Sequence, residues 1–410
     1  MEKNKEFDVV LMGATGYTGK LVAEYLYNNY KADSNLKWAM AARNREKLEK
    51  VRSEVADESI PIIIADSANE ASLIELVNRT KVVCTTVGPY AKYGSLLVEV
   101  CVEQGAHYCD LTGEVPWMVE MINLYHDRAS SKKLKIVHNC GFDSIPSDMG
   151  VHFMQQQAKE KTGSYAKSID MRVKAFAGGL SGGTYASLSE VMADARADKA
   201  VYGILTNPYS LNPDGEQYGP DQKDLQAVVF DEVSQSWNYP FIMAGINTKV
   251  VRRSNALLDY PYGKNFRYSE SAMTGKGFSN RLKATSAAAS LGMMMLAKPG
   301  TFIKKIVDKK LPKPGEGPTK KEREDGFYNL RFYTKLQDDS LVVGKVTGDM
   351  DPGYGSTSKM LAECAISLAK DELQETYGLI TPAVAMGDSL LTRLIENAGL
   401  TFTYDINIEA

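Results

Sequence analysis

Gly13-Ala14-Thr15-Gly16-Tyr17-Thr18-Gly19 follows an apolar run, Phe7–Met12, and precedes a stretch, Lys20–Leu26, with the composition of a helix. A glycine-rich turn between a strand and a helix is the setting in which dinucleotides bind. The first N–H groups of a helix lack intrahelical partners, and the helix dipole makes that end attractive to a pyrophosphate. The spacing is G-x-x-G-x-x-G instead of G-x-G-x-x-G, so an ordinary strand-to-helix turn is the alternative.

The composition is that of a soluble globular protein with more than one core. At 410 residues the chain is longer than one typical domain, so two domains are expected. Hydrophobic residues make up 44% and charged residues 24% of the chain, which is ordinary for globular proteins. The formal net charge of −3 offers no argument for a nucleic-acid partner. Whether the chain forms an oligomer is left open.

Cysteine and histidine usage argues against disulfides and metals. The five cysteines are dispersed without a C-x-x-C pair, which favours a reducing compartment, and we expect a cytoplasmic protein. Only four histidines are present, also scattered, so no metal site is predicted. The N-terminus is polar and lacks the apolar core of a signal peptide, and no run of 18 apolar residues predicts a transmembrane helix.

The N-terminal third alternates strand-like and helix-like segments. Single helices between consecutive strands imply right-handed crossovers and a parallel, Rossmann-type sheet. Ligands bind such sheets at the carboxyl ends of the strands, so the loops that follow the strands are the candidate site. Beyond the first, the predicted strands are 36–42, 60–65, 81–86, 107–110 and 134–138.

Arg43 follows the second predicted strand, where an NAD site would carry an acid for the ribose hydroxyls. A guanidinium there can bind a 2′-phosphate through two parallel hydrogen bonds, so NADP(H) is the predicted cofactor. The alternative is a solvated arginine at a helix start. Asp66 follows the third strand, where it would either contact the adenine edge or cap the next helix.

The loops after the fourth, fifth and sixth strands are polar and contain glycine. Val87-Gly88-Pro89-Tyr90 would bring a stiff backbone close to the nicotinamide ribose, although a plain Gly-Pro turn is the alternative. The segments 110–114 and 139–148 follow the next two strands at the same rim, the edge of the sheet formed by the carboxyl ends of the strands. The predicted cofactor contacts are Gly13, Thr15, Gly16, Tyr17, Thr18, Gly19, Arg43, Asn44, Asp66, Val87, Gly88, Pro89 and Tyr90.

The rest of the chain predicts a second α+β domain. Residues 168–176 alternate like a half-exposed strand, and 331–336 with 341–348 predict a hairpin, so the second sheet should be largely antiparallel. The glycine cluster at 178–183 would either shape a substrate entrance or form a simple loop. We predict an NADP-binding Rossmann domain over 1–150 and an α+β substrate or lipid-associated domain over 151–350. C-terminal helices over 351–410 would return to the first domain.

The segment 284–313 is unusual because small and apolar residues at 284–297 are followed by six lysines. It is too short to span a bilayer. It would either lie on a membrane or lipid surface, held by apolar insertion and anionic lipid, or form a buried small-residue helix with a solvated basic loop.

These residues together resemble the saccharopine dehydrogenase-like oxidoreductases, in the branch of the trans-acting enoyl reductases. The resemblance spans nearly the whole chain, although Ala42 stands where this branch usually has glycine. The stretches that carry it are Gly-Ala-Thr-Gly-Tyr-Thr-Gly at 13–19, Ala-Ala-Arg-Asn at 41–44, Val-Gly-Pro-Tyr at 87–90, Asp-Leu-Thr-Gly-Glu at 110–114, Gly-Phe-Asp-Ser-Ile-Pro-Ser-Asp at 141–148, Asp-Pro-Gly-Tyr at 351–354 and Thr-Pro-Ala-Val-Ala-Met-Gly-Asp at 381–388.

The resemblance implies NADP(H) and a hydrophobic small-molecule or carrier-bound acyl substrate, reduced at an enoyl or carbonyl group. It does not imply saccharopine, whose several carboxylates would need a convergent set of Arg or Lys that the sequence does not reveal. Tyr90, Glu114 and Asp143 are the predicted catalytic residues, with Tyr93 and solvent as other proton sources. The competing hypothesis is a non-catalytic NADP(H)-binding scaffold or sensor at a lipid surface.

Overall fold

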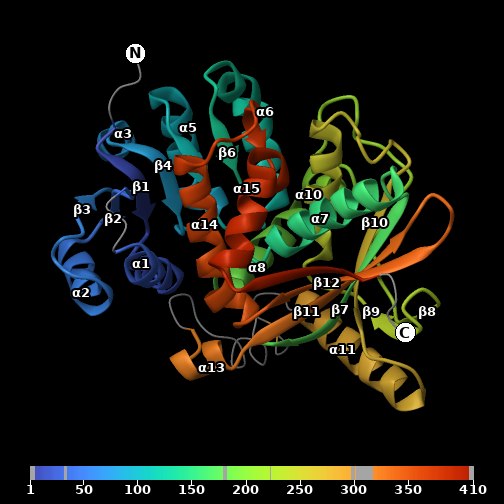
Figure 1. Ribbon diagram of the computed structural model, residues 1–410. Coiled ribbons are helices and arrows are strands. Elements are labelled where there is room, and N and C mark those ends of the chain that lie inside the picture. Colours follow the sequence, from blue (N-terminus) through green and yellow to red (C-terminus); the bar gives the residue numbers. More distant parts are fainter. Residues whose placement is uncertain are drawn as a thin grey trace. The chain divides into compact units, whose positions relative to one another are not determined.

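Parallel strands form the sheet of the first unit in the computed structural model, which describes residues 5–31, 35–178, 182–221, 223–296, 301 and 317–405 (Figure 1). Their order is β13-β6-β5-β4-β1-β2-β3. Every residue of β1 and β2 is buried, as expected of a sheet covered on both faces. The strands are β1 (Phe7–Met12), β2 (Trp38–Ala42), β3 (Ile62–Ile64), β4 (Thr80–Thr85), β5 (His107–Cys109), β6 (Lys135–Val137) and β13 (Gly378–Ile380).

Helices from both ends of the chain cover this sheet. In Figure 1 the red C-terminal helices stand beside the blue and teal strands, and α14 packs on β1, β4 and β5. The carboxylate of Glu363, on α14, is fully buried and accepts hydrogen bonds from Tyr25 and Tyr30 of α1 at 2.7 and 2.6 Å. The helices are α1 (Tyr17–Tyr30), α2 (Arg45–Val55), α3 (Glu70–Asn78), α4 (Tyr90–Tyr93), α5 (Ser95–Gln104), α6 (Val115–Ser131), α14 (Thr357–Lys370) and α15 (Pro382–Glu396).

The second unit is built on a mostly antiparallel sheet. The strand order is β14-β12-β11-β7-β10-β9-β8, and only the β7–β10 pair is parallel. Its strands are β7 (Ser168–Ala177), β8 (Val229–Asp231), β9 (Ser236–Tyr239), β10 (Arg267–Met273), β11 (Phe327–Lys335), β12 (Leu341–Gly348) and β14 (Leu400–Asp405). Its helices are α7 (Ile145–Thr162), α8 (Gly182–Ala197), α9 (Lys199–Thr206), α10 (Ala244–Leu257), α11 (Phe278–Leu296) and α13 (Lys320–Glu324). A short π-helix, η1 (Pro352–Ser356), precedes α14.

The predicted fold class, a parallel Rossmann-type sheet plus an α+β domain with a largely antiparallel sheet, is confirmed. The chain divides differently from a simple three-part sequence, however. The first unit comprises 1–145, 315–317 and 353–398, and the second comprises 146–314, 318–352 and 399–410. The C-terminal segment therefore contributes helices and a seventh parallel strand to the first unit, but its last strand, β14, joins the second sheet.

The seventh parallel strand lies within 351–410, a segment for which the sequence predicted helices and no strand. Gly378–Ile380 pairs with β6, and α15 starts only at Pro382, which is suited to a first helical position. A three-residue strand is too short to show a periodic pattern, because its existence depends on the neighbouring strand.

Candidate functional site

The glycine loop between β1 and α1 is a tight turn held against β2. Gly13 has a φ of +92°, and its N–H donates to Ala41 O at 2.9 Å. A Cβ on Gly19 would lie 2.1 Å from Gly13 O, so only glycine lets α1 pack this closely on the loop. The helix begins after Gly16 with no side-chain cap and no acid in its first turn. Its first N–H groups are therefore the donors that a pyrophosphate would need.

In the loops after β2 and β3, the Arg43 side chain makes no polar contact with the described part of the protein. Arg43 is exposed, and its guanidinium makes no hydrogen bond or ion pair with another described residue. Asn44, in contrast, caps α2 by accepting from the N–H of Lys47 at 2.9 Å. Asp66 accepts from Ala68 N at 3.0 Å in a local turn, so it is not the cap of the following helix. Arg43 is thus the residue on this rim best placed to bind an anion.

The loop after β4 is tied to the glycine loop and to the loop after β5. Thr86 Oγ1 donates to Gly13 O at 3.2 Å. Tyr90 is buried, and its hydroxyl donates to Thr85 O at 3.2 Å and accepts from Leu111 N at 3.1 Å. Burial raises the pKa of Tyr90 well above that of a free phenol. The stretch Val87–Tyr90 is therefore held in one position, and the Tyr90 hydroxyl is engaged by backbone.

Glu114 fixes the same loop from the other side. Its side chain is buried, and its two carboxylate oxygens accept from the N–H groups of Tyr90 and Ala91 at 2.8 and 2.9 Å. These are the first N–H groups of α4, which has no cap of its own. The structure thus brings two of the predicted catalytic residues, Tyr90 and Glu114, into direct contact through the backbone of the loop Val87–Tyr90.

The buried pair of Asp110 and His138 is a feature of this rim that sequence reasoning did not identify. The two residues follow adjacent strands, β5 and β6, and His138 Nδ1 lies 2.7 Å from Asp110 Oδ2. Asp110 also accepts from the Tyr108 hydroxyl and from Thr112 N. His138 Nε2 has no hydrogen-bond partner among the described residues, and the ring packs edge-on to Trp117. Polar residues at the carboxyl ends of neighbouring strands were the sequence signal that could have revealed this pair.

The third predicted catalytic residue, Asp143, lies on the loop between β6 and α7 and is half-buried. That loop is anchored by Phe142 N, which donates to the Thr357 hydroxyl at 2.9 Å. Tyr93, at the end of α4, keeps 42% of its surface exposed. These two side chains retain accessible surface, unlike Tyr90 and Glu114.

Comparison with known proteins shows which family has this sequence. Residues 9–137 match the profile of the saccharopine dehydrogenase NADP-binding domain. A Mycobacterium tuberculosis protein, provisionally named a trans-acting enoyl reductase, is 40% identical over 95% of this chain and 96% of its own length. The trans-acting enoyl reductase of Mycobacterium ulcerans is 36% identical over the same shares.

The chain belongs to the trans-acting enoyl reductase family. It is therefore an NADP(H)-dependent oxidoreductase with a saccharopine dehydrogenase-like NADP-binding domain. The fold agrees, because the saccharopine dehydrogenase of Saccharomyces cerevisiae superposes with a TM-score of 0.55 over 97% of this chain and 99% of that chain, at 11% identity.

The NADP(H) of the family fits the residues of the first unit. A Cβ at Gly13 would collide with Thr86 and Val87, and one at Gly19 would collide with the Gly13 carbonyl, so glycine lets the loop and the start of α1 pack closely. That packing leaves the first N–H groups of α1 available to a pyrophosphate. Arg43 supplies a cation where the 2′-phosphate of NADP(H) would lie, and no acid stands there to prefer the ribose hydroxyls of NAD.

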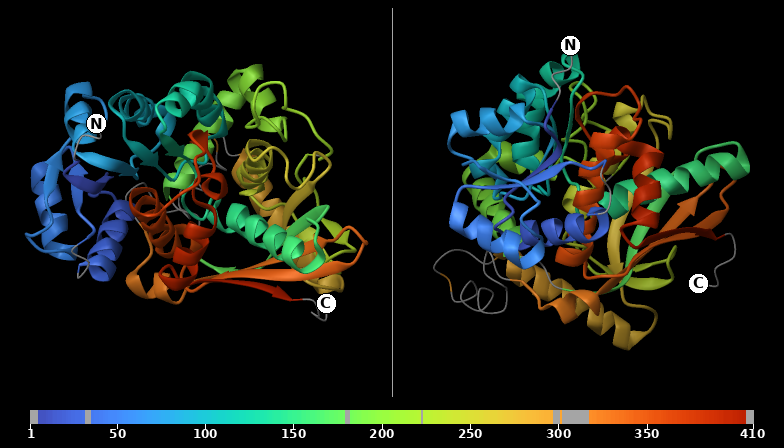
Figure 2. Two further views of the ribbon diagram at one scale, coloured as in Figure 1. Left: turned by 45° about the horizontal axis from the view of Figure 1, so that its top comes forward. Right: turned by 60° about the vertical axis from the view of Figure 1, so that its left-hand side comes forward.

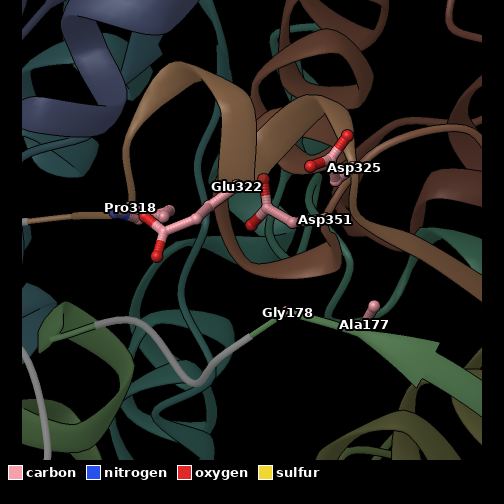
Figure 3. Close-up of a pocket in the computed structure, with 6 residues that line it drawn as sticks. All are labelled: Ala177, Gly178, Pro318, Glu322, Asp325 and Asp351. Atoms are coloured by element: carbon pink, nitrogen blue, oxygen red, sulfur yellow. The ribbon is translucent and has the colours of Figure 1, made fainter.

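The second unit of this enoyl reductase homologue has an acidic pocket of about 370 Å³ at the end of β7 (Figure 3). Gly178 and Gly326 make room for Asp351, whose backbone would lie 2.4 Å from a Cβ on Gly326. Part of the glycine cluster predicted to shape a substrate entrance, 179–181, lies outside the described residues. The pocket is lined by Ala177, Gly178, Pro318, Glu322, Asp325 and Asp351.

A second hollow of about 320 Å³ beside β10 contains several arginines. Arg172 is paired with Asp231 at 2.9 Å, and Arg252 with Asp221 at 2.7 Å. Arg252 also donates to the carbonyl of Tyr268. Arg172 and Arg252 are therefore neutralised by the protein's own carboxylates. Arg267 and Lys223 also line the hollow, together with five acidic residues of the described ranges, so the lining is not the excess of cations that a polycarboxylate such as saccharopine would need.

Two further properties of the described residues concern metals and membranes. Within 5–31, 35–178, 182–221, 223–296, 301 and 317–405, no three His, Cys, Asp or Glu side chains are arranged to hold a metal ion. In the same ranges, no helix combines the length and apolar character needed to cross a bilayer.

Proposed function

We propose that this oxidoreductase reduces the carbon–carbon double bond of an enoyl group on a hydrophobic, carrier-bound acyl chain. The observation that carries the proposal is the match to trans-acting enoyl reductases over 95% of the chain at 36–40% identity. The paired arginines beside β10 support an uncharged acyl substrate over a polycarboxylate.

Reduction of an enoyl group adds a hydride to one carbon of the double bond and a proton to the other. NADP(H) supplies the hydride when it is bound. The glycine loop would hold the pyrophosphate, and Val87–Tyr90 would position the nicotinamide side, because Glu114 and Thr85 restrain that loop. Asp143 is the candidate proton donor, because the residue is half-buried with Oδ1 enclosed, whereas Tyr90 and Glu114 are committed to backbone groups.

A panel of enoyl thioesters tests the proposal. NADPH oxidation, followed by absorbance, is expected with long-chain enoyl thioesters and to a lesser degree with short ones. Mass spectrometry should find the saturated product in the same amount as the NADP⁺ formed. Cofactor binding without turnover on enoyl or carbonyl substrates would instead favour the scaffold or sensor function.

Arg43 is proposed to select NADPH over NADH. Replacing it with alanine removes charge-assisted hydrogen bonds worth about 1.5–3 kcal/mol each, so NADPH affinity should fall at least about ten-fold while NADH affinity barely changes. Fluorescence titration with both cofactors measures this. Arg45→Ala is the matched control, because Arg45 is exposed nearby but pairs with Glu49. An equal loss for both cofactors in the Arg43→Ala protein would remove the basis for this role.

A further inference from the structure

Helix α11 stands out because almost none of it is buried. Along the whole helix, Phe278–Leu296, Ala284 is the one residue that is fully enclosed. Phe278 is 73% exposed and Leu296 is 65% exposed. The sequence left a buried small-residue helix and a surface helix as alternatives, and these exposures contradict the buried alternative. In Figure 2 the gold helix runs along the outer side of the second unit.

Five exposed apolar side chains of α11 lie along one stripe, and Met295 is exposed outside it. Phe278, Leu282, Ala289, Met293 and Leu296 follow one another at intervals of four, seven, four and three residues, and all five are exposed. Those intervals place side chains on the same face of a helix. The 19-residue helix is about 28 Å long, so the stripe is a line of that length.

The opposite face of α11 packs against the second unit. Ala284 is buried and Ala287 and Leu291 are half-buried, and the helix packs on β9. Near its C-terminal end, Arg196 of α8 donates to the carbonyl of Met295 at 2.6 Å. The apolar stripe thus points away from the unit that anchors the helix, and its side chains contribute little to the fold.

The charged side chains of the segment 276–296 are all positive and lie at its N-terminal end. Lys276, Arg281 and Lys283 lie at or near the start of the helix, and no Asp or Glu occurs between residues 276 and 296. A helix with an apolar stripe flanked by cations matches the chemistry of an anionic bilayer surface, where apolar side chains enter the acyl boundary and cations meet lipid phosphates.

We propose that α11 docks this enzyme on an anionic phospholipid membrane, lying flat with Phe278, Leu282, Met293 and Leu296 in the interface. The described residues alone carry the proposal. Membrane docking through α11 does not depend on which substrate the enzyme reduces, so docking and enoyl reduction can be measured separately.

Vesicle co-sedimentation of the full chain tests the proposal. The protein should sediment with phosphatidylcholine–phosphatidylglycerol vesicles, less so with phosphatidylcholine alone, and less at high salt. Phe278→Ser/Leu282→Ser/Leu296→Ser should reduce partitioning at least about ten-fold. Lys276→Gln/Lys283→Gln should reduce it by about five-fold per charge. Arg281 is left unchanged because its guanidinium carbon lies 4.9 Å from the Trp237 ring centroid, a contact that holds α11 on β9. The matched control, Leu124→Ser/Tyr202→Ser/Tyr218→Ser, removes three exposed apolar side chains elsewhere and should sediment like the unaltered protein.

Three results would overturn the proposal. They are absence of binding to anionic vesicles, equal sedimentation of the stripe variant, and equal loss in the control. If light scattering shows a dimer that the stripe variant cannot form, and vesicles are not bound, the stripe is a subunit interface instead. NADPH binding and melting temperature should be unchanged in every variant, which separates loss of docking from misfolding or from loss of the cofactor site.

Discussion

Gly19→Ala should abolish NADPH binding at ordinary cofactor concentrations, raising the Kd at least about 100-fold. A Cβ at this position would lie 2.1 Å from Gly13 O and 2.8 Å from Gly13 C, and both are backbone atoms that cannot rotate away. The helix start must therefore move off the loop. The N–H groups that would hold the pyrophosphate move with it, and each such bond to a charged group is worth about 1.5–3 kcal/mol.

The same substitution should lower the free energy of unfolding by about 1–3 kcal/mol, the usual cost of overpacking. Isothermal titration with NADPH and urea unfolding measure the two effects. Gly203→Ala is the control, because nothing lies within 4 Å of a Cβ there. It should leave the Kd unchanged and stabilise α9 by about 0.5–1 kcal/mol. A folded Gly19→Ala protein with wild-type NADPH affinity would show that this contact does not shape the cofactor site.

The parts of the fold that could be predicted were those encoded locally. β1, apart from Asp8, and β2 are apolar runs buried on both faces, and the glycine loop joins a strand to a helix within a few residues. Such patterns do not depend on distant partners. Strand β13 has only three residues and depends on pairing with β6, far away in sequence, so it carried no signal of its own. The alternation Leu400-Thr401-Phe402-Thr403-Tyr404 in β14 is a local strand signal, but its partner β12 could not be read from it.

The sequence offered more candidate residues for binding the cofactor than for the chemical step, and both sets stay predictions. Asp110 and His138 meet only after β5 and β6 pair, because 28 residues separate them. For Glu114 the sequence could indicate an acid near the carboxyl ends of the strands, but it could not show which groups the carboxylate contacts. For α11 it showed an apolar helix but not which side the protein covers, because burial is decided by tertiary packing.

Glu114→Ala should lower kcat/KM for an enoyl substrate at least about 100-fold, because misplacing a loop by about 1 Å can cost that much. It leaves the N–H groups of Tyr90 and Ala91 without their acceptor, so the free energy of unfolding should fall by about 1–3 kcal/mol. NADPH affinity should fall less than turnover, since the glycine loop and Arg43 are untouched. Steady-state kinetics, cofactor titration and urea unfolding measure the three quantities.

Glu114→Gln distinguishes a positioning role from proton donation. Glutamine keeps one acceptor oxygen for the start of α4 but cannot ionise, so a positioning role predicts that it recovers much of the stability and activity lost in the alanine variant. The pH profile of kcat/KM should then keep the shape of the unaltered enzyme. If Glu114 itself donates the proton, glutamine should be as inactive as alanine, and the limb of the pH profile that reports the carboxyl group should disappear. The two backbone N–H groups that occupy both carboxylate oxygens favour the first outcome.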